Sequence, residues 1–339
     1  MKLVLRRGVV LDAQACEPGA EQHLVVEVDG GGEREAICDT ALFGSCQPGD
    51  EVIVNTQATG LELGSGGFDI VHVNLTRGLG GTGVPGAHVM KLNYTSHQHA
   101  VLPVEEGDEQ RLETPAPVAA CLLHGQLAPL AWSFAQVAPE AKLGLVQGAG
   151  GALPGNHSRT VSMLRRDGLL AGFITASPSF GGEAEAMTVA GALAHGFGSL
   201  GWDAAVCAPG PGIIGSGSRF GNGSLAAADA LNAATALGLL PVLVPRISDS
   251  DPRERHRGIS HHTVTVGAML LGEAVVAWPA GHRRDGLEGL GFEEAAPDLD
   301  GYRDSGYPAS TMGRSIDDDP AFFAAPLAAG EVLGRLLAR

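Results

Sequence analysis

Strand-like and helix-like segments alternate along the sequence beyond residue 140, and this alternation limits the fold more than any other feature. Short apolar runs predict strands near residues 142–147, 170–175, 203–207, 240–244 and 274–278. Helical periodicity lies between them, near 158–167, 183–200, 223–237 and 260–272. Because parallel strands need a crossover, usually a helix, this order predicts a doubly wound, mainly parallel α/β sheet.

The first hundred residues have a different pattern. Short apolar, β-branched runs at 3–5, 23–28, 51–55 and 69–75 are separated by Gly, Asp and Pro turns, which predicts a small antiparallel, barrel-like β-domain over residues 1–105. A linker rich in acids and proline follows at 106–115, where Thr114 can cap a helix and Pro115 suits its first turn. The α/β domain is therefore expected over residues 116–339.

The end of the chain combines a long acidic segment with a final helix. Residues 281–320 hold ten acids and four arginines without clear periodicity, which predicts a long loop, either a lid or a packed excursion. An apolar helix is expected after Asp319-Pro320, with acids at its positive end.

Composition restricts the partners and the compartment. The 339 residues include 22 basic and 38 acidic ones, a net charge of −16, and such a surface repels nucleic acid. Five cysteines without a Cys-x-x-Cys pair indicate neither a disulfide framework nor a zinc ribbon, so a cytoplasmic protein is expected. Apolar runs are too short for a membrane span, so no membrane partner is expected. A homodimer is expected only because twofold assemblies are common.

Polar chemistry is concentrated after the predicted strands, where ligands of open α/β sheets bind. Residues 246–262 are the densest stretch, with four arginines, three histidines and three acids. Arg253, Arg255 and Arg257 alternate, so in an extended segment they would share a face and, with Arg246, clamp a phosphate or carboxylate. The formal charges of these four arginines and the three acids sum to only +1, so an internal ion-pair network explains the stretch equally well.

The histidines of this stretch are candidates for acid–base catalysis. Ser260 can cap a helix that starts at His261, and the positive helix end should lower the pKa of His261 and His262. Neutral imidazoles suit a general base or a metal ligand. The candidate catalytic residues are His256, His261, His262 and Asp251.

A divalent metal is possible, but the metal ligands stay unassigned. Oxygen and nitrogen ligands could come from Asp249, Asp251, His256, His262 and His282, but their spacing matches no familiar metal motif.

A glycine-rich loop precedes the helix predicted at 223–237. Its Gly210-Pro-Gly-Ile-Ile-Gly215 matches the dinucleotide fingerprint, but the helix starts near Ser224, and the next strand ends at Arg246 instead of an acid. A dinucleotide is therefore disfavoured, while 222–224 can cap the helix. Turned backbone N–H groups and added donors can still hold an anion, and the alternative is an ordered loop with glycines for tight turns. The candidate ligand-binding residues are Gly212, Gly215, Ser216, Gly217, Ser218 and Arg219.

Other nucleophile signals are weak. A Gly-x-Ser-x-Gly elbow is absent from the sequence. Cys207 ends a predicted strand beside the glycine-rich loop, but a buried structural thiol is the favoured interpretation. His97 and His99 form a compact polar group that is expected at the surface.

Residues 248–263, with their interleaved arginines and histidines, resemble a bacterial family known as domain of unknown function 3866. Further support comes from Val89-Met-Lys-Leu-Asn-Tyr-Thr95, Ala228-Asp-Ala-Leu-Asn232 and Met312-Gly-Arg314. The resemblance covers the whole chain and implies an uncharacterised cytosolic protein without assigned catalytic residues.

Two hypotheses follow from the sequence. The first is an enzyme of unassigned reaction type that holds an anionic small molecule at the carboxyl edge of the sheet. The second is a non-catalytic ligand-sensing or scaffold protein, in which the arginine and histidine cluster is a structural ion-pair brace.

Overall fold

A computed structural model describes residues 2–61, 67–106, 115–284 and 286–339. The chain divides into two compact units, Met1–Leu102 and Pro103–Arg339. Each unit has its own core and is described by itself.

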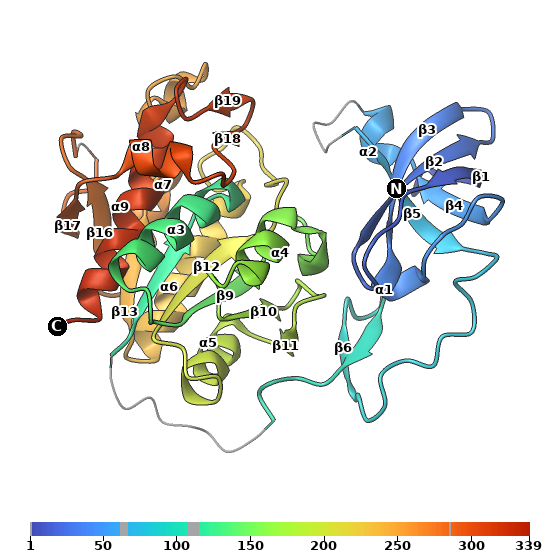
Figure 1. Ribbon diagram of the computed structural model, residues 1–339, viewed down its shortest axis with the longest axis horizontal. Helices are drawn as coiled ribbons and strands as arrows, with labels where there is room; N and C mark the ends of the chain where they lie inside the picture. The colour runs from blue at the N-terminus through green and yellow to red at the C-terminus, as the bar shows by residue number, and fades with distance from the viewer. Residues whose placement is uncertain (1, 62–66, 107–114, 285) are drawn as a thin grey trace. The chain divides into compact units, whose positions relative to one another are not determined.

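The first unit is built on a closed five-stranded barrel (Figure 1). Alternate residues of its strands point inward, so Leu24, Val26 and Val28 of one strand are buried. Neighbouring strands run antiparallel except for one parallel pair, β3 with β5, which confirms the small β-domain. The barrel strands, in the order β1-β2-β3-β5-β4, are β1 Leu5–Ala13, β2 Glu21–Val28, β3 Gly32–Asp39, β4 Glu51–Asn55 and β5 Asp69–Asn74; α1 Thr40–Phe43, α2 Gln57–Gly60, β6 Val89–Lys91 and β7 His99–Val101 complete the unit.

The second unit contains an eight-stranded sheet in which every neighbouring pair is parallel, so the predicted α/β fold is confirmed. The strand order is β11-β10-β9-β12-β8-β13-β16-β17. From β8 the chain first moves toward β11, then returns through β12 and continues past β8 to β17. The direction therefore changes around β12 and β8, where open α/β sheets bind ligands. The strands are β8 Pro117–Cys121, β9 Leu143–Gly148, β10 Gly172–Ala176, β11 Ala184–Ala186, β12 Ala204–Pro209, β13 Leu240–Val244, β16 Val275–Pro279 and β17 Gly291–Ala295.

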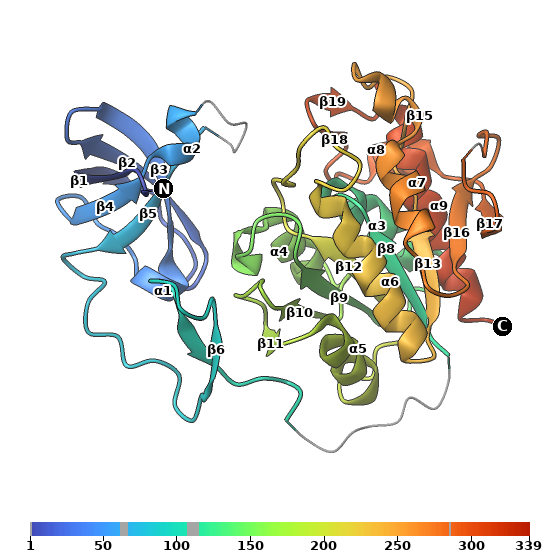
Figure 2. The same cartoon turned by 180° about the vertical axis from the view of Figure 1, so that it is seen from behind.

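Helices cover both faces of this sheet (Figures 1 and 2). Val118 and Ala120 of β8 point into the core beneath α5 and α6, while Ala119 and Cys121 point into the core beneath α3, α4 and much of α9. Gly330 lets α9 approach α3, because a Cβ there would lie 2.3 Å from the Leu130 carbonyl oxygen. The helices are α3 Leu127–Val137, α4 Arg159–Arg166, α5 Val189–Gly198, α6 Ala226–Ala236, α7 His261–Ala268, α8 Leu299–Asp304 and α9 Pro320–Leu336.

Three predictions for this unit need correction. The first element after Pro115 is the strand β8 and not a helix; the proposed cap, Thr114, lies outside the described residues. β8 is buried on both faces, so it shows no alternation and merges with the apolar helix α3. Residues 281–320 are also not a plain loop, because they hold β17, α8 and a short hairpin of β18 Ser310–Thr311 with β19 Arg314–Ser315. The predicted helix at 183–200 starts later, at Val189, because β11 precedes it.

Within the described ranges, no helix has both the length and the hydropathy needed to cross a membrane.

Candidate functional site

The segment 246–262 leaves the carboxyl end of β13 and folds back on itself. A short hairpin of β14 Ile247–Ser248 with β15 Gly258–Ile259 closes it, and the 3₁₀ turn η4 Glu254–His256 lies between the two strands. Arg253, Arg255 and Arg257 would share one face only if the segment were extended. The chain turns between the two strands of the hairpin, so this condition is not met. Arg253 and Arg257 both contact Asp251, whereas Arg255 is exposed.

Asp251 is the centre of an ion-pair network. Its carboxylate is fully buried and accepts hydrogen bonds from Arg246 Nη2 at 3.0 Å, Arg253 Nη2 at 2.9 Å and Arg314 Nη2 at 3.4 Å. Burial alone would raise the pKa of Asp251, but the hydrogen bonds and charge of Arg253 and the charge of Arg246 hold it well below its usual range. A carboxylate held ionised in this way is a poor general base, so its role here is to pair arginines.

Asp319 extends the network to the start of α9. Its carboxylate accepts hydrogen bonds from Ser248 Oγ at 2.6 Å, the Asp249 backbone N–H at 3.1 Å and Arg314 Nε at 3.1 Å. The loop after β13 is thereby tied to residues 314–319, the end of the acidic segment. This contact joins the two segments that the second sequence hypothesis links by a structural brace.

The network has a surplus of positive charge. Three guanidinium groups, those of Arg246, Arg253 and Arg314, face two carboxylates, those of Asp251 and Asp319. Burial lowers the pKa of Arg246 to about 10, and its Nε is buried without a hydrogen-bond partner in the described part of the chain. The positive charge extends toward the neighbouring histidines.

The three histidines of the segment form a compact cluster (here called the histidine cluster: His256, His261 and His262). Their ring centroids lie 4.4 to 5.0 Å apart, and one ring nitrogen from each lies within 4.8 Å of the other two. Ser260 caps α7 by accepting the His262 backbone N–H, as predicted. His256 comes from η4 and the other two from the first turn of α7, so the hairpin brings them together.

Serine hydroxyls contact two of these rings. His256 Nδ1 lies 2.7 Å from Ser260 Oγ, and His262 Nδ1 lies 3.1 Å from Ser224 Oγ. Ser224 belongs to η3 Gly223–Leu225, the turn before α6. The predicted side-chain cap at residues 222–224 is not formed, because the Ser224 hydroxyl bonds to His262 instead.

The pKa of each clustered histidine is lowered, which the sequence predicted for His261 and His262 but not for His256. Burial lowers the pKa of His256 and His262 to about 3, and the charge of Arg246 adds to this. Burial also lowers the pKa of His261, with the charge of Arg255 next in importance. Burial and nearby arginines are therefore the main causes, where the sequence argument named the helix end.

The base of the glycine-rich loop packs backbone against backbone on the loop after β9. A Cβ at Gly223 would lie 1.9 Å from the Gly150 carbonyl oxygen, and one at Gly151 would lie 2.1 Å from the Gly210 carbonyl oxygen. These glycines are required by close approach of the two loops. α6 begins at Ala226, well beyond the third glycine of the fingerprint.

The tip of the glycine-rich loop makes no hydrogen bond to the histidine cluster among the described residues. The candidate residues at the tip are exposed, and the Arg219 guanidinium stacks 5.1 Å from the Phe220 ring centre. Hydrogen bonds join none of the described tip residues to 246–262; only Ser224, at the end of the loop, reaches His262. The tip candidates are Gly212, Gly215, Ser216, Gly217, Ser218 and Arg219.

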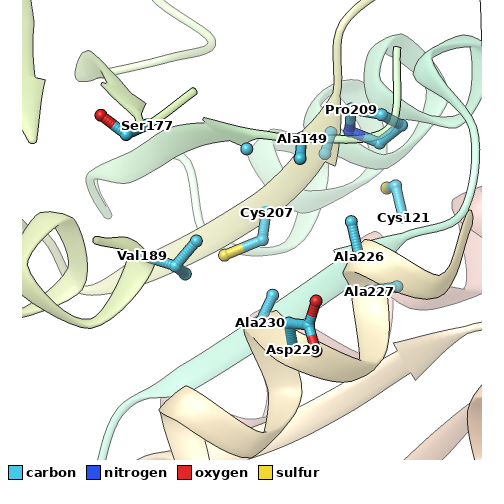
Figure 3. Close-up of a pocket in the computed structure, with 12 residues that line it drawn as sticks. Cys121, Ala149, Ser177, Val189, Cys207, Pro209, Ala226, Ala227, Asp229 and Ala230 are labelled. Atoms are coloured by element: carbon cyan, nitrogen blue, oxygen red, sulfur yellow. The ribbon is translucent and has the colours of Figure 1, made fainter. Parts of the chain in front are cut away.

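A small cavity of about 190 Å³ lies at the carboxyl ends of β8, β9 and β12, around the point where the strand order reverses (Figure 3). Cys121 and Cys207 line it from two strands, and Asp229 lines it from α6. Burial raises the pKa of Cys207 to about 12 and that of Cys121 further. Cys207 is therefore a buried, protonated thiol, which agrees with the favoured interpretation from the sequence.

The structure separates the residues considered for a metal. Asp249 and His282 line a different cavity of about 540 Å³ with Arg257, beside the β14–β15 hairpin. The Asp251 carboxylate already forms ion pairs with arginines. Only His256 and His262 come together, joined by His261.

Sequence reasoning missed several residues of this edge. Arg314 and Asp319 lie far along the chain, and only the acids at the helix start gave a signal. His124 follows the unrecognised strand β8; its Nε2 lies 2.8 Å from Ser158 Oγ and its Nδ1 lies 3.0 Å from the Pro209 carbonyl oxygen. Ser158 also caps α4, so this contact joins three edge loops.

In the barrel unit, His97 is half-buried, and its Nε2 lies 3.0 Å from His72 Nδ1.

Comparison with known families gave one match, to the family model described as "Protein of unknown function (DUF3866)", over residues 35–330. Comparison with curated proteins and with solved structures gave no match.

Proposed function

This chain belongs to the DUF3866 family, and we propose that it is an enzyme that acts on an anionic, phosphate- or carboxylate-bearing small molecule at the carboxyl edge of its parallel sheet. The observation that carries the proposal is the uncompensated positive charge beside the histidine cluster. A chain with a net charge of −16 has no general reason to gather cations there.

Arg255 is the best placed cation for such a ligand. It is exposed, and no carboxylate pairs with it among the residues that the structure describes. Its charge lowers the pKa of both His261 and His262. A planar guanidinium with free donors matches a phosphate or carboxylate group.

The remaining arginines differ in what they offer. Arg253 gives both Nε and Nη2 to Asp251, and Arg257 gives Nε to the Asp251 carbonyl oxygen. Arg246 is almost wholly buried. In the proposed function Arg255 binds the anion directly, the paired arginines supply a positive field, and the histidine cluster acts on the bound molecule. We place this activity in the cytoplasm, since the five cysteines are free thiols.

Calorimetric titration with inorganic phosphate, pyrophosphate and citrate tests the anion site. We expect at least one of these to bind and the Arg255→Gln variant to weaken it by about tenfold or more, because a charged hydrogen-bond pair is lost. Arg166→Gln is the matched control, since Arg166 is exposed on α4 and pairs with Asp167. Absence of binding by all three anions, or equal binding by Arg255→Gln, would contradict the proposal.

Turnover needs a second test, with a panel of phosphate esters and carboxylate esters. Any hydrolysis detected should be lost in His262→Ala while the fold, followed by circular dichroism, is kept. Retained turnover would remove His262 from the reaction.

A specific observation favours the second candidate function, a non-catalytic scaffold. Asp251 is shared by three arginines from two segments, and Asp319 ties the same loop to α9. Under this alternative none of the three anions binds, and Arg255→Gln therefore changes nothing, whereas Asp251→Asn destabilises the fold under either function.

A further inference from the structure

We propose that His256, His261 and His262 form a binding site for one divalent transition-metal ion of the zinc and cobalt class. The inference goes beyond the proposed function, because a metal can bind here whether or not the protein catalyses a reaction. It is carried by the positions of the ring nitrogens and by what holds the rings.

The three nitrogens are close to a ligand triangle. A tetrahedral ion with Zn–N bonds of about 2.0–2.1 Å places its nitrogen ligands roughly 3.3 Å apart. In the structure these nitrogens lie within 4.8 Å of one another, so the widest pair has to close by about 1.5 Å.

The serine contacts involve one nitrogen, Nδ1, in two of the three rings. Ser260 Oγ faces His256 Nδ1 and Ser224 Oγ faces His262 Nδ1. If each Nδ1 carries its proton and donates to serine, each Nε2 presents a lone pair. Metal-binding histidines usually have a hydrogen-bond partner of this kind on the other ring nitrogen, and it fixes the tautomer and the ring orientation.

His261 supplies an independent observation. Its Nε2 is buried and has no hydrogen-bond partner within the described ranges. Buried polar atoms without a partner are rare in folded proteins, and an ion is one of the few explanations for such an atom beside two other imidazoles.

The donor set selects the kind of metal. Three imidazoles without a carboxylate in the group favour zinc, cobalt or nickel over magnesium or calcium, which prefer oxygen. Three protein ligands also leave a fourth position open, as in catalytic zinc sites.

The surrounding arginines determine what takes that position. The charges of Arg246, Arg253 and Arg255 act on the cluster and repel a dication. An anion bound to the metal relieves this repulsion, so metal and anion should strengthen each other's binding. The fourth ligand is therefore an anion, either hydroxide or the acidic group of a small molecule.

Cobalt titration of the tag-free, chelator-treated full chain tests the site, with visible absorption reporting tetrahedral coordination and calorimetry reporting stoichiometry. We expect one equivalent of Co²⁺ per chain, displaced by Zn²⁺, and a loss of affinity of 100-fold or more in His261→Ala. His261 is the best variant, because no hydrogen bond to its Nε2 is lost. His282→Ala, from the neighbouring cavity, should bind as the unchanged protein does.

A variant that keeps all three ligands adds a second measurement. Ser224→Ala removes the partner of His262 Nδ1 and should weaken Co²⁺ binding by about 10- to 100-fold. Binding below one equivalent, or one equivalent that His261→Ala retains with unchanged affinity, would overturn the site. Co²⁺ binding without any anion binding would uphold the metal site and refute the proposed function, and anion binding without Co²⁺ would do the reverse.

Discussion

Replacement of Asp251 by asparagine is the sharpest test of the ion-pair network. Asp251 is fully buried and pairs with Arg246, whose side chain is only 3% exposed, so Arg246 is the arginine that most needs this carboxylate. Without the carboxylate, the Arg246 charge stays buried with no negative partner, and breaking a buried pair by removing one member costs about 3–5 kcal/mol. Arg253 is 45% exposed, so it adds little to this loss.

The expected change is large enough for thermal denaturation. In a unit of the size of Pro103–Arg339, 1 kcal/mol lowers Tm by about 2–4 °C, so Asp251→Asn should lower it by about 10 °C. Differential scanning calorimetry or circular dichroism at neutral pH measures this. The double variant Arg246→Met/Asp251→Asn should recover part of the loss, because the unpaired buried charge is gone.

Asp317→Asn is the matched control. Asp317 pairs with Arg303 at 2.8 Å, but both are well exposed, so its loss should cost no more than about 1 kcal/mol. If Asp251→Asn lowered Tm no more than Asp317→Asn, the view that Asp251 compensates a buried charge would be wrong.

Three further outcomes are expected. The pKa of Asp251 is lowered in the folded state, so the stabilisation by its carboxylate is complete above the unfolded pKa near 3.9 and is lost as the pH falls toward the folded value. The Tm difference between the native chain and Asp251→Asn should therefore shrink below about pH 4. A constant difference would contradict this. Gly223→Ala places a Cβ 1.9 Å from the Gly150 carbonyl oxygen, so the midpoint of urea unfolding should fall markedly, while Gly217→Ala, with open space at its Cβ, should have almost no effect. Cys207 should resist iodoacetamide in the folded protein and react only after unfolding, whereas the more exposed Cys16 should react first. Mass spectrometry of labelled peptides measures this order, and early labelling of Cys207 would contradict its burial.

The fold could be predicted wherever each element had a local pattern of its own. Strands β9, β10, β12, β13 and β16 are apolar runs bounded by turns, and helices follow most of them. β8 was missed, although it lies between β12 and β13 in the sheet, because a strand buried on both faces has no alternation and the next helix is equally apolar.

The site could be predicted only as far as it lies in one segment. Ser260 and the adjacent His261 and His262 gave the helix start and the direction of the pKa shifts. Arg314, Asp319 and Ser224 reach the segment from distant positions, and sequence spacing carries no information about such contacts. The β14–β15 hairpin was also hidden, because each of its strands has only two residues.

The structure divides the arginine- and histidine-rich segment into two halves that can have different roles. The half around Asp251 is turned toward Arg314 and the start of α9, and all its carboxylate hydrogen bonds go to arginines of the chain itself. The half from η4 onward holds the histidine cluster, and the charge of the unpaired Arg255 acts on it. A brace that fixes the hairpin also fixes His256 against α7, since His256 is bonded to Ser260 at the helix start. The brace and the proposed site are therefore compatible: loss of Asp251 should weaken Co²⁺ binding through the fold, whereas loss of His261 should weaken it without changing Tm.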